Sequence, residues 1–262
     1  MFALITTFYN EKNINRRNEF LQAIRYNADN SQIYKIYILC ESGEDFITGI
    51  DSKIQIINQE RRPKFKDLIK VANSLSSELI RIIANTDVYF NETLAKADKI
   101  KKKIVYCLTR WDLKLNGDIE FYPNFKSQDS WIFKDTLPEN IGDYYMGIPG
   151  CDNRLAREFC ESNFKIMNPS FSINSIHIHN TNKRTYDKGA DKVSGKYAYC
   201  LPVTLMGETK SKNINRLYLL VRRKYYLAIL ENRLDGFGKQ KNNLIIAYLW
   251  LFYYKLRIKL NG

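Results

Sequence analysis

Apolar and polar positions along the first 200 residues predict short strands separated by helices. Short apolar runs bounded by Asn, Gly or Ser indicate strands, and apolar positions three to four residues apart indicate helices. The expected strands are Ala3–Phe8, Ile33–Leu39, Lys53–Ile57, Leu79–Ala84, Ile104–Leu108, Trp131–Phe133 and Ser172–His179, and the expected helices are Asn15–Tyr26, Lys66–Leu75 and Asp152–Glu161. This alternation is typical of an α/β fold with an open, mostly parallel sheet flanked by helices.

The pattern changes near residue 206, where two long helical stretches begin, Ile214–Leu234 and Asn242–Leu260. We therefore divide the chain into a catalytic or binding domain, residues 1–205, and a helical appendage, residues 206–262. The longest apolar run, Leu244–Tyr254, has eleven residues, whereas about 17–25 are needed to span a bilayer. Its Trp and Tyr residues and its flanking Lys and Arg residues fit a helix at a membrane surface.

The net charge of +13 belongs mainly to this appendage, which carries twelve Lys and Arg residues against three Asp and Glu residues. A basic helix beside an aromatic, apolar run favours peripheral binding to an anionic membrane surface. The alternative is a helical hairpin that packs on the first domain and exposes its basic face to water. Nucleic acid is not the expected partner, because no recognisable nucleic-acid motif accompanies the charge.

The five cysteines are scattered and odd in number, which favours a reduced protein over a disulfide scaffold. The first residues show no basic leader and no small-residue cleavage site of the secretory type. We therefore expect a cytoplasmic protein, which the basic appendage could hold at the inner face of the cytoplasmic membrane.

Asn85-Thr86-Asp87 is the most informative short segment, because it follows a buried apolar strand directly. Ligands of open α/β sheets bind at the carboxyl ends of the strands. Carboxylate and amide oxygens at that place suit Mg²⁺ or Mn²⁺ carrying a diphosphate. The alternative is a plain turn at the end of a strand, which Asn and Asp also favour.

Four segments in order resemble the GT-A glycosyltransferases, in particular family-2-like members. They are ITTFYNE (Ile5–Glu11), ILCES (Ile38–Ser42), NTDVYF (Asn85–Phe90) and GCDNRLAR (Gly150–Arg157), and the resemblance covers about residues 2–180. Two positions depart from the family pattern. Asn85 stands in place of the first Asp of the DXD motif, and Cys151 stands in place of the Glu that usually precedes the acidic residue at 152.

Asp152 is the candidate general base, because it opens a predicted helix whose dipole favours the ionised carboxylate. A carboxylate there can take the proton of an attacking hydroxyl. The alternative is an ordinary helix cap, for which Asp is well suited. The resemblance favours the catalytic interpretation, and Asp129 is the second candidate for the base.

His177 and His179, the two histidines of the chain, lie on one face of a predicted strand. Two such imidazoles can converge on one metal or one phosphate, although the outer face of a strand can also carry His by chance. The resemblance implies that one of them completes a metal site with Asp87, without indicating which.

Further candidates lie at the other strand ends. We expect donor contacts from Thr7, Tyr9, Glu11, Glu41, Arg61, Arg62, Asn85 and Thr86. A guanidinium group suits phosphate oxygens, an aromatic ring can stack on a base, and a solvated loop charge is the alternative for the arginine pair. We expect acceptor contacts from Arg110, Trp111 and Asp112, where a Trp face could stack on a sugar; a core Trp beside a surface ion pair is the alternative.

These observations predict a metal-dependent, inverting glycosyltransferase that uses a nucleotide-sugar donor, Mn²⁺ or Mg²⁺, and a glycan or lipid-linked acceptor in surface polysaccharide or glycoconjugate synthesis. The alternative is a catalytically degenerate protein that binds a nucleotide sugar and docks on a membrane. The two departures from the family motifs support that alternative.

Overall fold

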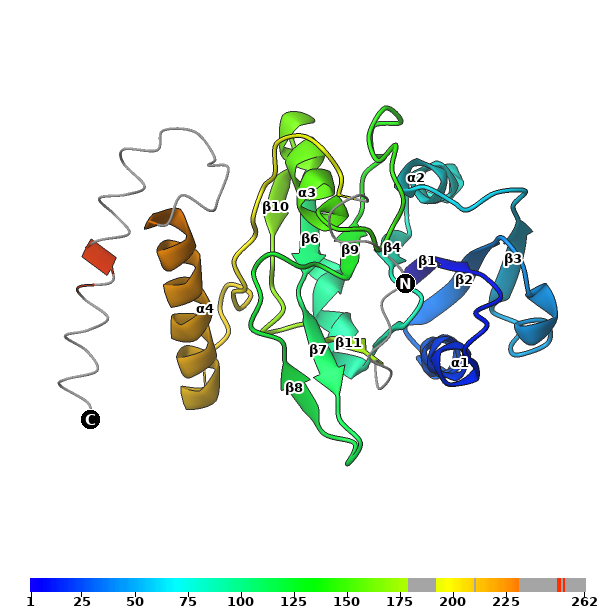
Figure 1. The fold of residues 1–262 in the computed structure, drawn as a ribbon, viewed down its shortest axis with the longest axis horizontal. Coiled ribbons are helices and arrows are strands. Elements are labelled where there is room, and N and C mark those ends of the chain that lie inside the picture. Colours follow the sequence, from blue (N-terminus) through cyan, green and yellow to red (C-terminus); the bar gives the residue numbers. More distant parts are fainter. Residues whose placement is uncertain (179–191, 210, 231–248, 251, 253–262) are drawn as a thin grey trace.

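A seven-stranded sheet forms the centre of the protein (Figure 1). The computed structural model describes residues 1–178, 192–209, 211–230, 249, 250 and 252. In spatial order the strands are β10 (Lys165–Met167), β6 (Ile104–Leu108), β9 (Ser130–Phe133), β4 (Ile80–Ala84), β1 (Phe2–Phe8), β2 (Ile33–Cys40) and β3 (Ile54–Asn58). The sequence prediction of an open, mostly parallel sheet is confirmed.

Parallel pairing places the functional strand ends together. β1 pairs in parallel with both β2 and β4, and β2 pairs in parallel with β3. The carboxyl ends of these four strands therefore reach the same edge of the sheet. β9 is the exception, since it runs antiparallel to both β4 and β6. Its amino end therefore lies at that edge and brings the residue before it, Asp129, beside Asn85.

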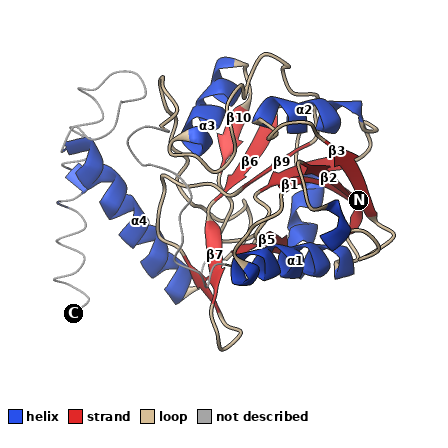
Figure 2. Cartoon of the chain, turned by 45° about the vertical axis from the view of Figure 1, so that its right-hand side comes forward, coloured by secondary structure: helices blue, strands red, loops and turns tan. Residues whose placement is uncertain are grey.

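Helices cover both faces of this sheet (Figure 2). α1 (Ile14–Asp29) packs on one face together with the 3₁₀ helix η2 (Glu92–Lys99), whereas α2 (Phe65–Ser74) and α3 (Cys151–Glu161) pack on the other. Alternation along β1 supplies both cores, because Leu4 belongs to the α1 side and Ile5 to the α2 side. A short 3₁₀ helix, η1 (Glu44–Phe46), follows β2.

A second, four-stranded sheet lies beside the first. Its order is β5 (Val88–Phe90), β11 (Ser175–His177), β7 (Arg110–Leu113) and β8 (Ile119–Phe121). The sequence analysis placed a longer strand at residues 172–179 and did not predict β5, β7, β8 or β10. These strands have three or four residues each and carry little periodicity. β5 follows Asp87 directly and pairs with β11, so this sheet places His177 next to the end of β4.

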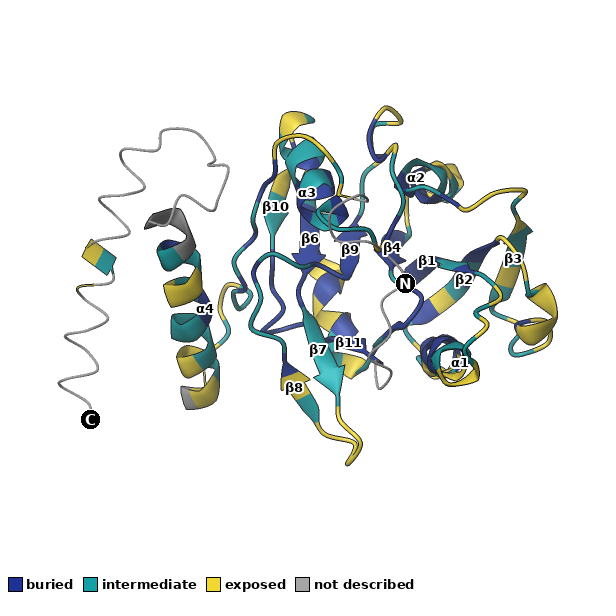
Figure 3. Ribbon diagram, in the orientation of Figure 1, coloured by how far each residue is buried: buried dark blue, intermediate teal, exposed yellow. Residues whose placement is uncertain are grey.

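The appendage begins with α4 (Lys212–Leu230), which packs on the first domain. Leu217, Val221 and Tyr225 of α4 join a cluster with Phe121 and Phe125. Figure 3 shows buried positions concentrated in the strands and exposed positions along the outer side of α4. The described part of α4 thus packs on the first domain, while most of the second expected helix lies outside the described residues. Among the helices described, none has the length and apolarity needed to cross a membrane.

Candidate active site

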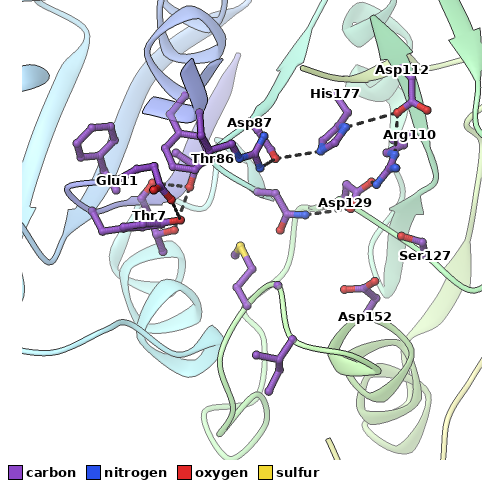
Figure 4. Close-up of a pocket in the computed structure, with 18 of the residues that line it drawn as sticks. Thr7, Glu11, Thr86, Asp87, Arg110, Asp112, Ser127, Asp129, Asp152 and His177 are labelled. Carbon is purple, nitrogen blue, oxygen red and sulfur yellow. Dashed lines mark hydrogen bonds and ion pairs between the residues drawn. The ribbon is translucent and has the colours of Figure 1, made fainter. Parts of the chain in front are cut away.

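A cleft of about 760 Å³ opens at the carboxyl edge of the central sheet. It is bounded by the ends of β1, β2 and β4, by β7 and by the start of α3 (Figure 4). The sequence-predicted site residues that line it are Thr7, Tyr9, Glu11, Glu41, Arg62, Asn85, Thr86, Asp87, Arg110, Asp112, Asp129, Asp152 and His177. Parallel strand ends, read from the sequence, thus gather in one cleft.

Tyr9 and Glu11 form one end of the cleft, just beyond β1. The Tyr9 hydroxyl donates to Glu11 Oε2 at 3.0 Å, and burial together with this carboxylate raises the pKa of Tyr9 to about 12. Thr7 and Thr86 join the ends of β1 and β4, since the Thr86 hydroxyl donates to the Thr7 carbonyl at 2.8 Å. Glu41 follows β2 with an exposed side chain. This end presents one aromatic ring and two carboxylates to a ligand.

The two neighbouring arginines of the expected donor site, Arg61 and Arg62, have different surroundings. Arg62 lines the cleft, where its guanidinium donates to the Met146 carbonyl at 2.8 Å and lies over the Tyr145 ring. Arg61 instead forms a two-pronged ion pair with Asp67 at 2.9 and 3.0 Å and leaves 54% of its side chain exposed. Arg61 does not line the cleft, because its guanidinium is held by Asp67 in the first turn of α2. Its expected donor role is therefore a misassignment.

Asp87 lies buried at the end of β4 between two cationic groups. His177 Nε2 is 2.9 Å from Asp87 Oδ2, and the Arg16 guanidinium pairs with the same oxygen. Burial raises the pKa of the Asp87 carboxyl, but these two groups outweigh it and hold the pKa well below its ordinary value. Burial lowers the pKa of His177, but Asp87 and Asp112 raise it to about 9.

The donor set beside Asp87 fits a divalent metal that is shared with a substrate. Asp87 Oδ1 is buried without a hydrogen-bond partner among the described residues, and His177 Nε2 lies 2.9 Å from the other oxygen of the same carboxylate, Oδ2. Ligation needs the neutral imidazole, so an ion would take the place of a proton on His177. No group of three His, Cys, Asp or Glu residues within the described part of the chain forms a complete metal site. Mg²⁺ sites often have one or two protein ligands and complete their shell with phosphate oxygens and water. His179 lies outside the described residues.

Asn85 and Asp129 are bound to each other. The Asn85 side-chain amide donates to Asp129 Oδ1 at 2.9 Å, and the Asn85 backbone N–H donates to the Asp129 carbonyl at 3.0 Å. Burial raises the pKa of Asp129, although Arg110 lies 3.6 Å from its other oxygen. The amide in place of the first Asp of DXD thus serves as a donor to a neighbouring carboxylate, which a second Asp would repel.

Asp152 occupies the first turn of α3 and faces the cleft (Figure 4). Its carboxylate accepts hydrogen bonds from the Cys151 thiol, at 3.0 Å, and from the Gln128 backbone N–H. Burial and the nearby Asp129 charge outweigh these bonds and raise the pKa of Asp152 to about 7. A carboxylate with this pKa can exchange a proton at neutral pH, as a general base requires.

If Asp152 removes a proton during the reaction, the rate depends on its ionisation. We expect kcat/KM to rise about tenfold per pH unit below pH 7 and to level off above it, because only the ionised carboxylate acts as a base. Asp129, Arg110 and Cys151 surround the group and do not change this direction. Initial rates between pH 5 and 9 test the expectation, and a rate that falls as pH rises through 7 contradicts it.

The three expected acceptor residues lie on β7, where side chains alternate between the two faces of the strand. Arg110 and Asp112 line the cleft and pair with each other at 2.8 Å. Trp111 points to the other side, packs against Phe121 and donates to the Ser170 carbonyl at 2.7 Å. Its expected stacking on a sugar is therefore wrong, and Tyr122, which does line the cleft under Arg110, is the available ring.

Arg16 is a site residue that the sequence analysis missed, as is Tyr122. Arg16 lies in the first turn of α1, three residues after the capping Asn13, where an acidic residue is the usual choice. A cation at this unfavourable position is the feature of the sequence from which a functional role of Arg16 could have been predicted. Its partner Asp87 is 71 positions away along the chain, so the pairing itself could not be read from spacing.

No protein-family model matches the chain, and no match is found among curated proteins. Solved structures of similar fold include the mannosyltransferase PcManGT from Pyrobaculum calidifontis in complex with GDP-Man and Mn²⁺, with 13% identity and a TM-score of 0.47 over 95% of this chain and 69% of that chain. They also include S. aureus TarS 1–349 in complex with UDP-GlcNAc, with 13% identity and a TM-score of 0.39 over 95% and 71%. A third is 4-diphosphocytidyl-2C-methyl-D-erythritolsynthase from Anaerococcus prevotii, with 13% identity and a TM-score of 0.39 over 67% and 90%.

Proposed function

We propose that this protein is a glycosyltransferase that moves a sugar from a nucleotide-sugar donor to a hydroxyl group of a glycan or lipid-linked acceptor, in surface polysaccharide or glycoconjugate synthesis. The observation that carries the proposal is the meeting of Asp87, His177 and Asp152 on one cleft of about 760 Å³. Sites for small molecules and cofactors have volumes of about 300–1,000 Å³. The cleft thus has room for a donor and the reacting end of an acceptor.

The donor is bound between the ends of β1, β2 and β4. Tyr9 offers a ring for the base, and the Glu41 carboxylate accepts hydrogen bonds from the base or ribose. Arg62 offers a planar guanidinium to the diphosphate oxygens. Asp87 and His177 would hold a divalent metal, Mn²⁺ or Mg²⁺, which would supply further positive charge to the departing diphosphate.

The transfer is a single displacement at the anomeric carbon. Asp152 accepts the proton of the acceptor hydroxyl while its oxygen forms the new glycosidic bond. The bond from the anomeric carbon to the diphosphate oxygen breaks, and its electron pair leaves with the nucleoside diphosphate. Attack from the side opposite the leaving group inverts the configuration. The pKa of about 7 at Asp152 suits this step at neutral pH, and it favours an enzyme over a catalytically degenerate binding protein.

A donor screen tests the function. The protein is incubated with UDP-, GDP- and CMP-sugars in Mn²⁺, and the release of the free nucleotide is measured with and without candidate glycan acceptors. We expect one donor to raise the melting temperature and to be turned over faster when an acceptor is present. Stabilisation by a nucleotide sugar without turnover of any donor would instead support the binding-protein alternative.

The membrane partner remains a proposal that rests on α4. Arg216 and Arg223 are exposed on this helix, and each basic residue near an anionic surface contributes about 1 kcal/mol of binding. We expect sedimentation with vesicles that contain phosphatidylglycerol, and binding at least tenfold weaker for the R216E/R223E variant. Equal binding to vesicles of phosphatidylcholine alone would contradict an electrostatic attachment.

A further inference from the structure

The side chain of Arg16 carries a charge whose position the fold of α1 alone does not explain. It lies at the third position of the helix, close to the positive end of the helix dipole, where a cation is unfavourable. The side chain is only 15% exposed, so the guanidinium is also largely removed from water. Arg16 thus departs from two usual preferences, the one against a cation at a helix N-terminus and the one against removing a charge from water. Such departures are expected at functional sites.

Three contacts hold the guanidinium at the floor of the cleft. It donates to Asp87, to Glu19 Oε2 at 2.6 Å and to the Ile178 carbonyl at 3.2 Å. Phe20 lies under it, 4.7 Å from ring centroid to guanidinium carbon. A guanidinium has five N–H groups, so two of them have no partner in the part of the chain that the structure describes. Arg16 also lines the cleft directly, which makes these two groups available to a ligand.

The anion most suited to this place is the diphosphate of the donor. Asp87 lies at the strand end where the proposed function puts the diphosphate, and Arg16 is bound to the same carboxylate. If a metal ion were bound by the free oxygen of Asp87, the guanidinium of Arg16 would keep its full charge and its planar set of donors, which matches phosphate oxygens. Arg16 and Arg62 both line the cleft and carry a positive charge that does not depend on a metal.

We propose that Arg16 binds the diphosphate of the donor and gives nucleotide binding a component that needs no divalent metal. The inference rests on the proposed function, which supplies the diphosphate. Arg16 is then a specificity residue for diphosphate donors. A metal ion contributes to nucleotide binding, but it is not the sole positive charge that binds the diphosphate.

The experiment measures the affinity of UDP and GDP by calorimetry, once in EDTA and once in Mn²⁺. Arg16→Met keeps the apolar stem of the side chain and removes the fork. The matched control is Arg17→Met, the next residue of the same helix turn, whose guanidinium lies over Phe46 and does not line the cleft. We expect the wild-type protein to bind one of the two nucleotides in EDTA, Arg16→Met to weaken this binding at least tenfold, and Arg17→Met to change it less than twofold.

Equal affinity of folded Arg16→Met and wild-type protein in EDTA overturns the inference, as does wild-type binding that is lost entirely in EDTA but present in Mn²⁺. Failure of the wild-type protein to bind either nucleotide under both conditions would argue against the diphosphate donor site itself, and with it the proposed function. Glu19 is buried and loses a partner in Arg16→Met. If that variant does not fold, R16M/E19Q also removes the carboxylate charge that Arg16 neutralises, and the same loss is expected.

Discussion

Replacement of Asp152 by Asn is expected to lower sugar transfer by about 10²–10⁴-fold, the range that a general base contributes. Asn fills the same volume but cannot accept the proton of the acceptor hydroxyl. The donor end of the cleft is formed by Tyr9, Glu41 and Arg62 and is untouched. The affinity for the nucleotide should therefore change by less than threefold. Steady-state rates with the donor found in the screen, together with calorimetry of nucleotide binding, measure both quantities.

Asp129→Asn is the matched control, because Asp129 is a buried carboxylate of the same cleft and the alternative candidate for the base. It is bound by Asn85 and lies near Arg110, so we expect a smaller loss of rate. The pH profile should move to lower pH, because the Asp129 charge that raises the pKa of Asp152 is gone. Folding is checked by thermal melting. A raised pKa means that ionisation of Asp152 opposes folding as pH rises toward 7. Asp152→Asn should therefore melt no lower than the wild-type protein at pH 8. More than a tenth of the activity in Asp152→Asn, with a larger loss in Asp129→Asn, would assign the base to Asp129.

The cleft could be predicted from the sequence because it depends on local signals and one rule of topology. Apolar runs located β1, β2 and β4, and parallel strands carry their carboxyl ends to one edge. Residues that follow such strands directly, such as Glu41 and Asp87, therefore had to share a site. Asp152 followed the same logic, since a Gly-rich turn and an Asp mark the start of a helix.

Other features depend on contacts between segments that are far apart in sequence. β7 has four residues, too few for a periodic pattern, and its side-chain alternation decides that Arg110 faces the cleft while Trp111 faces the core. Once the strand is known, this separation follows from the alternation of side chains. Arg61 likewise lies outside the cleft because it pairs with Asp67, and no sequence motif predicts this contact. Short strands and long-range ion pairs thus set the limit of what the sequence predicts here.

Replacement of Asp87 by Asn is expected to lower sugar transfer by about 10²–10³-fold, the usual effect of removing one group that stabilises developing charge. The amide keeps the shape of the side chain but carries no charge toward a metal ion or toward Arg16 and His177. The affinity for Mn²⁺, measured by electron paramagnetic resonance in the absence of donor, should fall at least tenfold. This second readout does not depend on turnover.

The same substitution also removes the anion from a buried cluster, so its effect on folding must be separated from its effect on chemistry. Breaking a buried ion pair by removing one partner costs about 3–5 kcal/mol, and Arg16 and His177 would both lose Asp87. Rates are therefore compared at a temperature at which melting curves show the variant to be folded. Asp112→Asn is the matched control, because Asp112 contacts the other nitrogen of His177, at 3.4 Å, from a more exposed position. We expect it to lose less than tenfold in rate and to keep its Mn²⁺ affinity within threefold. Among the described residues, the end of β4 is the one strand end of the cleft that brings a buried carboxylate and a His together. Wild-type rates in folded Asp87→Asn would therefore show that this strand end does not hold the diphosphate.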